Sequence, residues 1–157
     1  MDVHPYRTAW LTRDLDTWAQ ALAPDVVLHS PILRAPFEGR ADAIELFGVL
    51  FAELGEVQIT DELSDGDVHA FFWRVQIGAK SVEGVDLLRC NERGEISEIR
   101  VLIRPLPDIA LFAGAIGPAL AAKRTPIRGL VARLMILPLR AILTLADTIS
   151  ARLIQRR

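Results

Sequence analysis

One segment of the sequence places a single carboxyl group among apolar residues. Residues 82–90 are typical of a β-strand, in which alternate side chains share a face. Asp86 then shares its face with Val82, Gly84, Leu88 and Cys90. On a buried face, desolvation would keep this carboxyl protonated and able to donate a hydrogen bond to a ligand oxygen. Alternation alone does not choose the buried face, and backbone amides, Arg100 or Arg104 are alternative partners for Asp86.

Two further side chains could take part in proton chemistry. Tyr6 carries a phenol that could bind a ligand oxygen, or it could be a half-buried helix aromatic with its hydroxyl in water. His29 is of the residue type best suited to general base work near neutral pH. Strand alternation points His29 away from Ser30, so it would reach a site there only if a bulge before Pro31 turned it round; the alternative is a capped or surface histidine.

Motifs for other chemistries are missing from the sequence. It has no Gly-rich phosphate loop, no Cys/His metal spacing and no nucleophile elbow. The single cysteine, Cys90, allows neither an intramolecular disulfide nor a zinc site built on cysteines. We therefore expect no metal and no cofactor.

The spacing of apolar residues predicts the helices and strands that must position these side chains. Residues 5–22 read as helical, with a junction at residues 12–16 where Asp14 or Asp16 could cap a second short helix. A short strand at residues 26–30 and a loop at residues 31–38 should follow. The next helix opens near Arg40 and ends before a glycine at position 55.

A run of strands comes next. Four are predicted, at about residues 56–63, 68–77, 82–90 and 96–104, separated by short turns rich in Gly, Asp and Asn. Short turns between successive strands indicate an antiparallel meander. Helices followed by strands indicate an α+β fold with helices packed on one face of a curved, mainly antiparallel sheet.

The C-terminal third is predicted to be helical, at about residues 107–122 and 126–155. In the last helix most of the circumference is apolar, which predicts that it is mostly buried, and Pro138 should kink it. The helix could pack on its own domain, on a partner subunit or shallowly on a membrane. Residues 123–157 hold eight Lys/Arg against one acid, Asp147, whereas residues 1–122 hold 10 Lys/Arg against 19 Asp/Glu. This basic edge either complements the acidic body or contacts an anionic lipid or partner.

Size, charge and the N-terminus set broad limits. A chain of 157 residues with 51% hydrophobic residues suits one domain with a sizeable core. A net charge of −2 argues against a dedicated nucleic-acid binder. The N-terminal residues lack the pattern of a signal peptide, and one free cysteine suits a reducing compartment, so we expect a cytoplasmic protein.

Three stretches carry a resemblance to a known family. They are DLDTWAQALAPDVVLHSPI, PFEGRADAIELF and VDLLRCNERGEISEIRVLIRPL. They resemble the SnoaL-like and ketosteroid-isomerase-like branch of the nuclear transport factor 2-like superfamily, over about residues 6–106. The resemblance implies the conical, cystatin-like fold for residues 1–106 and a homodimer. It leaves residues 107–157 as a helical extension, packed on the same domain or on a partner subunit.

The same resemblance implies a set of site residues. Tyr6 and Asp86 stand where ketosteroid isomerases hold the tyrosine and the protonated aspartic acid of an oxyanion hole. Ser30 stands where those enzymes hold an aspartate base, and a hydroxyl is no useful base unless another group activates it. The pocket walls are expected to be Trp10, Phe47, Phe51, Phe72, Leu88, Ile99, Val101 and Ile103.

Three functions remain open from the sequence. The first is a cofactor-independent isomerase, cyclase or dehydratase for a hydrophobic carbonyl compound, with Tyr6 and Asp86 stabilising an enolate and His29 as the candidate base. The second is a non-catalytic binding protein for an apolar metabolite or lipid, which Ser30 favours. The third is a structural or dimerisation module.

Overall fold

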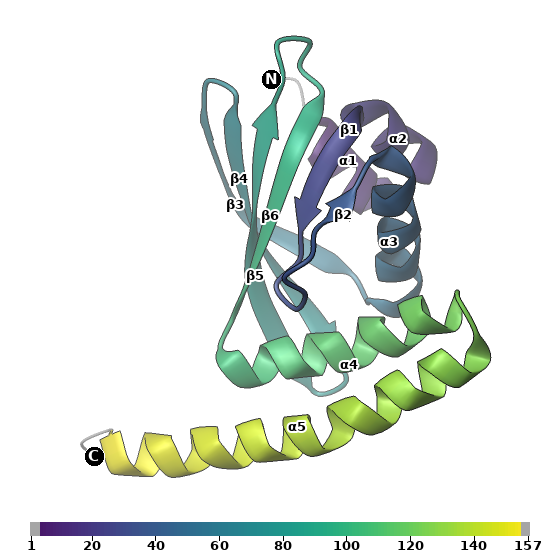
Figure 1. The fold of residues 1–157 in the computed structure, drawn as a ribbon. Coiled ribbons are helices and arrows are strands. Elements are labelled where there is room, and N and C mark those ends of the chain that lie inside the picture. Colours follow the sequence, from purple (N-terminus) through teal and green to yellow (C-terminus); the bar gives the residue numbers. More distant parts are fainter. Residues whose placement is uncertain (1–3, 155–157) are drawn as a thin grey trace. The chain divides into compact units, whose positions relative to one another are not determined.

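The computed structural model describes residues 4–154, which divide into two compact units at Ile103/Arg104 (Figure 1). The N-terminal unit contains most of the secondary structure. Its elements are α1 (Pro5–Thr12), α2 (Leu15–Ala21), β1 (Leu22–His29), β2 (Phe37–Glu38), α3 (Arg40–Glu53), β3 (Val57–Asp65), β4 (Val68–Ile77), β5 (Lys80–Cys90) and β6 (Ile96–Arg104). The C-terminal unit consists of α4 (Leu106–Ala122) and α5 (Pro126–Ile154).

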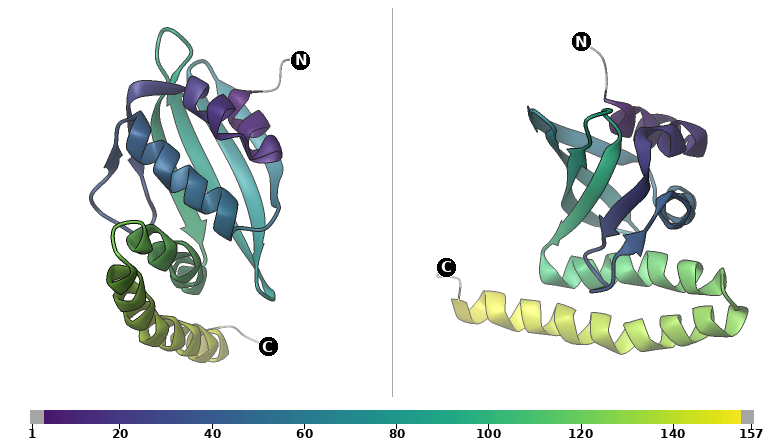
Figure 2. Two further views of the ribbon diagram at one scale, coloured as in Figure 1. Left: turned by 90° about the vertical axis from the view of Figure 1, so that its right-hand side faces the viewer. Right: turned by 45° about the horizontal axis from the view of Figure 1, so that its top comes forward.

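The N-terminal unit is built on one six-stranded sheet with helices on one side. The strand order is β2-β1-β6-β5-β4-β3. The pairs β3–β4, β4–β5 and β1–β2 are antiparallel, and β1–β6 is parallel. Helices α1, α2 and α3 lie against one face of this sheet (Figure 2). The predicted α+β fold, with helices on one face of a mainly antiparallel sheet, is therefore confirmed.

A left-handed residue separates the first two helices. Arg13 has φ 54° and ends α1, and Asp14 then caps α2 by accepting the backbone N–H groups of Asp16 and Thr17. The Arg13 guanidinium donates to the carbonyl oxygens of Phe51, Leu54 and Gly55 at the end of α3. The junction predicted at residues 12–16 is confirmed, and its arginine ties α1 to α3.

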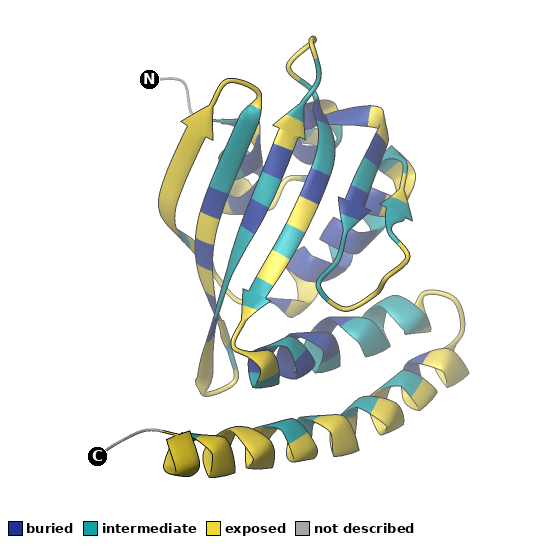
Figure 3. Cartoon of the chain, turned by 60° about the vertical axis from the view of Figure 1, so that its left-hand side comes forward, coloured by how far each residue is buried: buried dark blue, intermediate teal, exposed yellow. Residues whose placement is uncertain are grey.

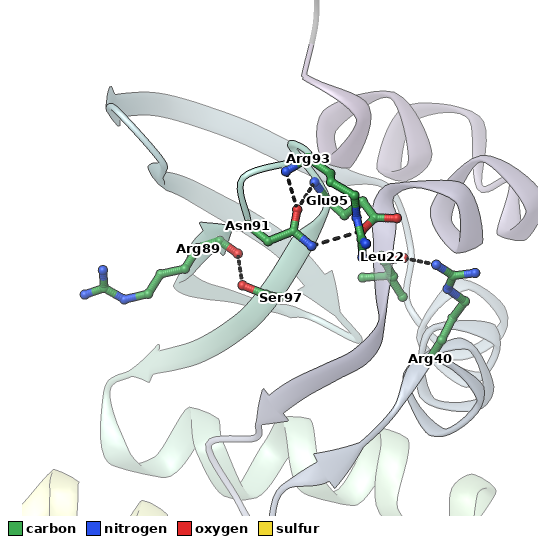
Figure 4. A network of polar contacts seen from close by, with 7 residues as sticks. All are labelled: Leu22, Arg40, Arg89, Asn91, Arg93, Glu95 and Ser97. Atoms are coloured by element: carbon green, nitrogen blue, oxygen red, sulfur yellow. Dashed lines mark hydrogen bonds and ion pairs between the residues drawn. The ribbon is translucent and has the colours of Figure 1, made fainter.

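The turn between β5 and β6 is held by one side chain (Figure 4). Asn91 Oδ1 accepts the backbone N–H groups of Arg93 and Glu95, both at 3.0 Å, and Asn91 Nδ2 donates to Glu95 Oε2 at 2.9 Å. Gly94 in this turn has φ 76°, a conformation that glycine adopts without strain. The turn fixes the register of β5, which carries Asp86, against β6.

The segment predicted as a loop contains a short strand. Phe37 and Glu38 pair with Leu28 and Val27, which makes β2 the edge strand of the sheet. A strand of two residues is too short to produce an alternating pattern, so periodicity could not reveal it. The strand predicted from residue 26 also begins earlier, at Leu22, where pairing with β6 shifts register before Val27.

In the C-terminal unit, α4 and α5 run side by side, joined by a short turn (Figure 1). The prediction that the last helix is mostly buried is wrong, because most of α5 is exposed (Figure 3). The helix continues through Pro138. Among the residues that the structure describes, α5 alone is long and apolar enough to cross a bilayer, by length and composition only.

Candidate functional site

Three side chains from three elements meet inside the N-terminal unit. The Tyr6 hydroxyl of α1 donates a hydrogen bond to Asp86 Oδ2 of β5. The Trp73 indole N–H of β4 donates to Asp86 Oδ1 at 3.0 Å. Each carboxyl oxygen of Asp86 therefore faces one donor. The arginine alternatives do not apply, because Arg100 is exposed and pairs with Glu98, and Arg104 is exposed.

Strand register creates this meeting point. Phe71 lies opposite Asp86 and Trp73 lies opposite Gly84, so their side chains share the inner face of the sheet. Gly84 leaves room for the indole ring. A Cβ atom at this position would overlap the Trp73 ring and lie 2.7 Å from the Leu102 carbonyl oxygen. The glycine of β5 thus sets where Trp73 lies and allows its hydrogen bond to Asp86.

Aromatic rings enclose the pair. Tyr6 is 0% exposed and Asp86 is 3% exposed. The Tyr6 ring centroid lies 4.5 Å from that of Phe71 and 5.4 Å from that of Trp18. Trp18 in turn lies 4.1 Å from Phe47. Because the Tyr6 hydroxyl and the carboxyl are enclosed in this way, a ligand can reach them only if core side chains move.

Burial changes the acidity of both groups. Desolvation raises the pKa of Asp86 to about 6, although the hydrogen bonds from Tyr6 and Trp73 favour its ionised form. Burial and the neighbouring Asp86 charge raise the pKa of the Tyr6 phenol well above its usual value. Tyr6 therefore stays protonated at neutral pH, while Asp86 changes its charge near pH 6. Above that pH the single Tyr6 hydroxyl proton is donated to the Asp86 carboxylate, and below it the protonated carboxyl adds a second O–H donor to the site.

Two buried indole nitrogens near Tyr6, those of Trp10 and Trp18, have no hydrogen-bond partner among the residues that the structure describes. Trp18 is 0% exposed. Buried donors of this kind are uncommon in folded proteins. A ligand oxygen or a water molecule close to Tyr6 could satisfy such a group.

Most of the predicted wall residues lie on the inner side of the unit, but Phe72 does not. Phe72 is 38% exposed, whereas Phe71 is 0% exposed and contacts Tyr6. The prediction of Phe72 as a wall residue is therefore wrong by one position of strand alternation. The predicted residues that are buried are Trp10, Phe47, Phe51, Leu88 and Ile99, and those partly buried are Val101 and Ile103.

The structure separates the two other predicted catalytic residues from the Tyr6–Asp86 pair. Ser30 Oγ accepts the backbone N–H groups of Ile32 at 3.2 Å and Leu33 at 3.0 Å, so this hydroxyl holds a turn. The His29 side chain is 40% exposed, and its Nε2 lies 3.2 Å from Glu98 Oε1. Since the pairing of β1 with β6 is regular from Val27 to His29, no bulge there turns the ring inward, and the residue predicted as the base lies beside Glu98 at the surface instead.

A second cluster of titratable groups lies near the start of α1. Ligand atoms of His4, His69 and Cys90 lie within 4.8 Å of one another. However, His4 Nδ1 accepts the Tyr6 backbone N–H at 3.2 Å and thereby caps α1. An acceptor at Nδ1 leaves the ring proton on Nε2, so His4 as placed has no free nitrogen for a metal. Burial lowers the pKa of His4 to about 4, in keeping with a neutral capping ring.

Solved structures resemble this fold closely. A steroid delta-isomerase from Pseudomonas aeruginosa matches with a TM-score of 0.70 and 22% identity over 75% of this chain and 88% of that one. An uncharacterized protein with a cystatin-like fold from Silicibacter pomeroyi matches with a TM-score of 0.67 and 25% identity, over 83% and 94% of the two chains. A nuclear transport factor 2-like protein of unknown function from Mesorhizobium loti matches with a TM-score of 0.58 and 19% identity, over 64% and 85%.

Sequence comparison gives the family. A search among curated proteins found no match. The family model of the SnoaL-like domain matches residues 3–99, which include both Tyr6 and Asp86. Together with the cystatin-like architecture, this match shows that the chain belongs to the SnoaL-like domain family.

Proposed function

We propose that the N-terminal unit is a cofactor-independent enzyme of the isomerase or cyclase type that acts on a hydrophobic carbonyl compound. The observation that carries this proposal is the enclosed Tyr6–Asp86 pair, a phenol and a carboxyl of raised pKa among aromatic rings. Membership of the SnoaL-like family and the structural likeness to a steroid delta-isomerase support it.

The chemistry assigned to the pair is stabilisation of negative charge on oxygen. When a base removes a proton from the carbon next to a carbonyl group, the electron pair moves to the carbonyl oxygen and forms an enolate. The Tyr6 hydroxyl would turn from Asp86 Oδ2 to this oxygen, and protonated Asp86 would donate a second hydrogen bond to it. Both bonds strengthen as the charge develops. Because the hydrogen bond from Tyr6 favours the ionised form of Asp86, a Tyr6 hydroxyl that turned to the ligand would raise the pKa of Asp86 further and favour its protonated form.

A second candidate function is binding without turnover, and Ser30 favours it. The Ser30 hydroxyl already accepts two backbone N–H groups, so it is held in a turn and does not act as a base. The same enclosed pair would then hold the oxygen of an apolar metabolite. This alternative keeps the hydrogen-bonding role of Tyr6 and Asp86 and removes only the proton transfer.

Isomerisation of an unconjugated 3-ketosteroid tests the enzyme proposal. Wild-type protein, Asp86→Leu and Ser30→Asp should be compared, with Asp61→Leu as a control, because Asp61 is an exposed carboxylate on β3. Activity in the wild type and Asp61→Leu that is lost in Asp86→Leu would support the enzyme. Activity that appears only in Ser30→Asp would show that the hydrogen-bond donors suffice and that the natural protein lacks a base for this substrate.

Tryptophan fluorescence measures ligand binding whether or not the ligand is turned over. All three tryptophans, Trp10, Trp18 and Trp73, lie buried in the N-terminal unit, so their emission should report a ligand that enters it. A steroid with a phenolic ring, which resembles the enolate, should change the emission of the wild type and bind Asp86→Leu at least about tenfold more weakly. A wild type that neither turns over nor binds these compounds would contradict both candidate functions for steroid-sized ligands.

A further inference from the structure

The long helix α5 exposes an apolar face over most of its length. Its side chains recur about every 3.6 residues on one side of the helix, and Ile142 and Leu145 are 62% and 61% exposed. We call this surface the outer face of α5; its members are Ile127, Leu130, Leu134, Ile142, Leu145 and Ile149. Exposed apolar surfaces of this extent mark sites of interaction with a partner or a membrane.

The opposite side of α5 packs on α4. Gly129 allows close approach, since a Cβ atom there would lie 2.8 Å from Ala122 Cβ. Ile136 and Arg140 pack against Gly114 of α4 in the same way. The inner side is therefore occupied by the partner helix, and the outer face remains free of α4.

From Ile127 to Ile149 the charged side chains of α5 lie off the outer face, and Arg152 is the first charged residue in line with it. At 100° per residue, Arg133, Arg140 and Asp147 fall on the inner side, with Ile136. Within α5, which the structure describes in full, no charged residue falls among the outer-face side chains from Ile127 to Ile149. Arg140 contacts α4, whereas Arg133 and Asp147 are exposed beside the inner side. An apolar side that faces outward is the reverse of a typical surface helix of a water-soluble domain.

The basic charge around α5 favours an anionic membrane over a second copy of the chain as the surface that covers the outer face. Residues 123–157 contain eight Lys/Arg and one acid, Asp147, and Lys123, Arg124, Arg128 and Arg152 flank the apolar face. Two copies brought face to face would place two strongly basic segments together, which is unfavourable. Anionic lipid headgroups would instead attract these side chains while the acyl region takes up the apolar face.

The positions of two arginines distinguish lying on the membrane from spanning it. Arg133 and Arg140 lie within the apolar part of α5, and each would cost about 3 kcal/mol at the centre of a bilayer. A helix that lies in the interface with its outer face toward the acyl chains avoids this cost, because Arg133 and Arg140 stay on the side turned away from them. We propose that the outer face of α5 inserts shallowly into the surface of an anionic lipid membrane and so holds the protein at the bilayer.

Vesicle flotation of the full-length protein tests this proposal. Vesicles of phosphatidylcholine alone should bind weakly, and vesicles that also contain phosphatidylglycerol should bind at least about tenfold more strongly at physiological salt. The double variant Leu134→Glu/Ile142→Glu should lose more than about tenfold in binding, because it adds two negative charges and removes apolar contact. The matched control is Leu11→Glu/Leu63→Glu, two exposed leucines of the N-terminal unit, which should bind as the wild type does.

Three results would overturn the proposal. The first is a wild type that binds neither kind of vesicle. The second is a wild-type dimer, seen by light scattering, that Leu134→Glu/Ile142→Glu converts to a folded monomer, which would assign the outer face to a second copy. The third is bound protein that resists extraction by alkaline carbonate, which would indicate a spanning helix. Circular dichroism of each variant controls for folding.

Discussion

The two units place their apolar and polar side chains in opposite ways. The N-terminal unit buries polar groups inside an aromatic core, where Tyr6 and Trp73 donate to Asp86. The C-terminal unit exposes leucines and isoleucines along α5 and keeps Arg140 on the side that packs against α4. Both arrangements cost free energy in an isolated water-soluble domain, through desolvation of polar groups in one unit and exposure of apolar surface in the other.

The buried polar groups of one unit and the exposed apolar side chains of the other indicate where function is expected. A protein retains an unfavourable arrangement when a ligand or a surface offsets its cost in use. In the N-terminal unit, under our proposal, the buried carboxyl binds the oxygen atom of a ligand. In the C-terminal unit, we propose, lipid covers the outer face of α5. Catalytic or binding chemistry and membrane attachment are thereby assigned to separate parts of the chain.

Truncation of one large apolar side chain in each unit should give the largest difference in the free energy of unfolding. Phe47→Ala removes a fully buried ring packed on Trp18 and should lower the free energy of unfolding by about 3–5 kcal/mol. Leu134→Ala removes a side chain from the exposed outer face and should change it by less than about 0.5 kcal/mol. Urea denaturation followed by circular dichroism measures both. Equal losses would mean that the outer face is buried in solution.

Asp86 should make stability depend on pH in the N-terminal unit. Because burial raises its pKa from 3.8 to about 6, the folded protein holds this proton more tightly than the unfolded chain does. The resulting stabilisation is complete below the unfolded pKa and is lost as pH rises through about 6, a change of about 3 kcal/mol. Asn at this position can accept the Trp73 indole N–H at its amide oxygen and donate its amide N–H to the Tyr6 hydroxyl oxygen, and it does not titrate.

The measurement is the difference in unfolding free energy between the wild type and Asp86→Asn. It is made at several pH values, from the unfolded pKa of Asp86, 3.8, to above its folded pKa of about 6. The variant should gain relative to the wild type as pH rises. His4, whose pKa is lowered to about 4, acts in the opposite sense over part of this range, and the difference between the two proteins cancels its contribution. A difference that does not change with pH would show that Asp86 titrates normally.

Much of the N-terminal unit could be predicted from local pattern. Alternation and turn residues predicted β4, β5 and β6 to within a few residues, because strands with one buried face and polar turns carry this signal directly. The Asp14 cap was also readable from its residue type. Tyr6 and Asp86, which lie 80 positions apart, were brought together by family resemblance, and their hydrogen bond confirms that they meet.

Other features depend on contacts that no local pattern contains. Phe71 and Phe72 are adjacent and identical in type, and only the pairing of Phe71 with Asp86 shows which one faces inward. The hydrogen bond from Trp73 to Asp86 depends on the space that Gly84 leaves for the indole ring. An apolar circumference suggested that α5 is buried, although the same pattern suits a helix whose apolar side meets lipid.

Gly84 tests how tightly the aromatic site is packed. Gly84→Ala should destabilise the protein by about 1–3 kcal/mol, because the added methyl group overlaps Trp73 and the Leu102 carbonyl is only 2.7 Å away. The control is Gly48→Ala in α3, where the methyl group makes an ordinary 3.6 Å contact with Leu15 and should stabilise by about 0.5–1 kcal/mol. Thermal unfolding ranks the two variants, and similar melting temperatures would contradict close packing at Gly84.

The smallest effect is expected from an ion pair on the solvent-facing side of β4 and β5. Arg74 Nη2 lies 2.6 Å from Glu83 Oε1, one position beyond the Trp73–Gly84 pair, but both side chains are largely exposed. A double-mutant cycle with Arg74→Ala and Glu83→Ala should give a coupling of about 0.2–1 kcal/mol that falls at high salt, because water and ions screen the pair. The bond between Trp73 and Asp86, on the inner side, should give a larger coupling that salt leaves unchanged. If the two couplings were equal, burial would not be what distinguishes the enclosed site from the surface of the sheet.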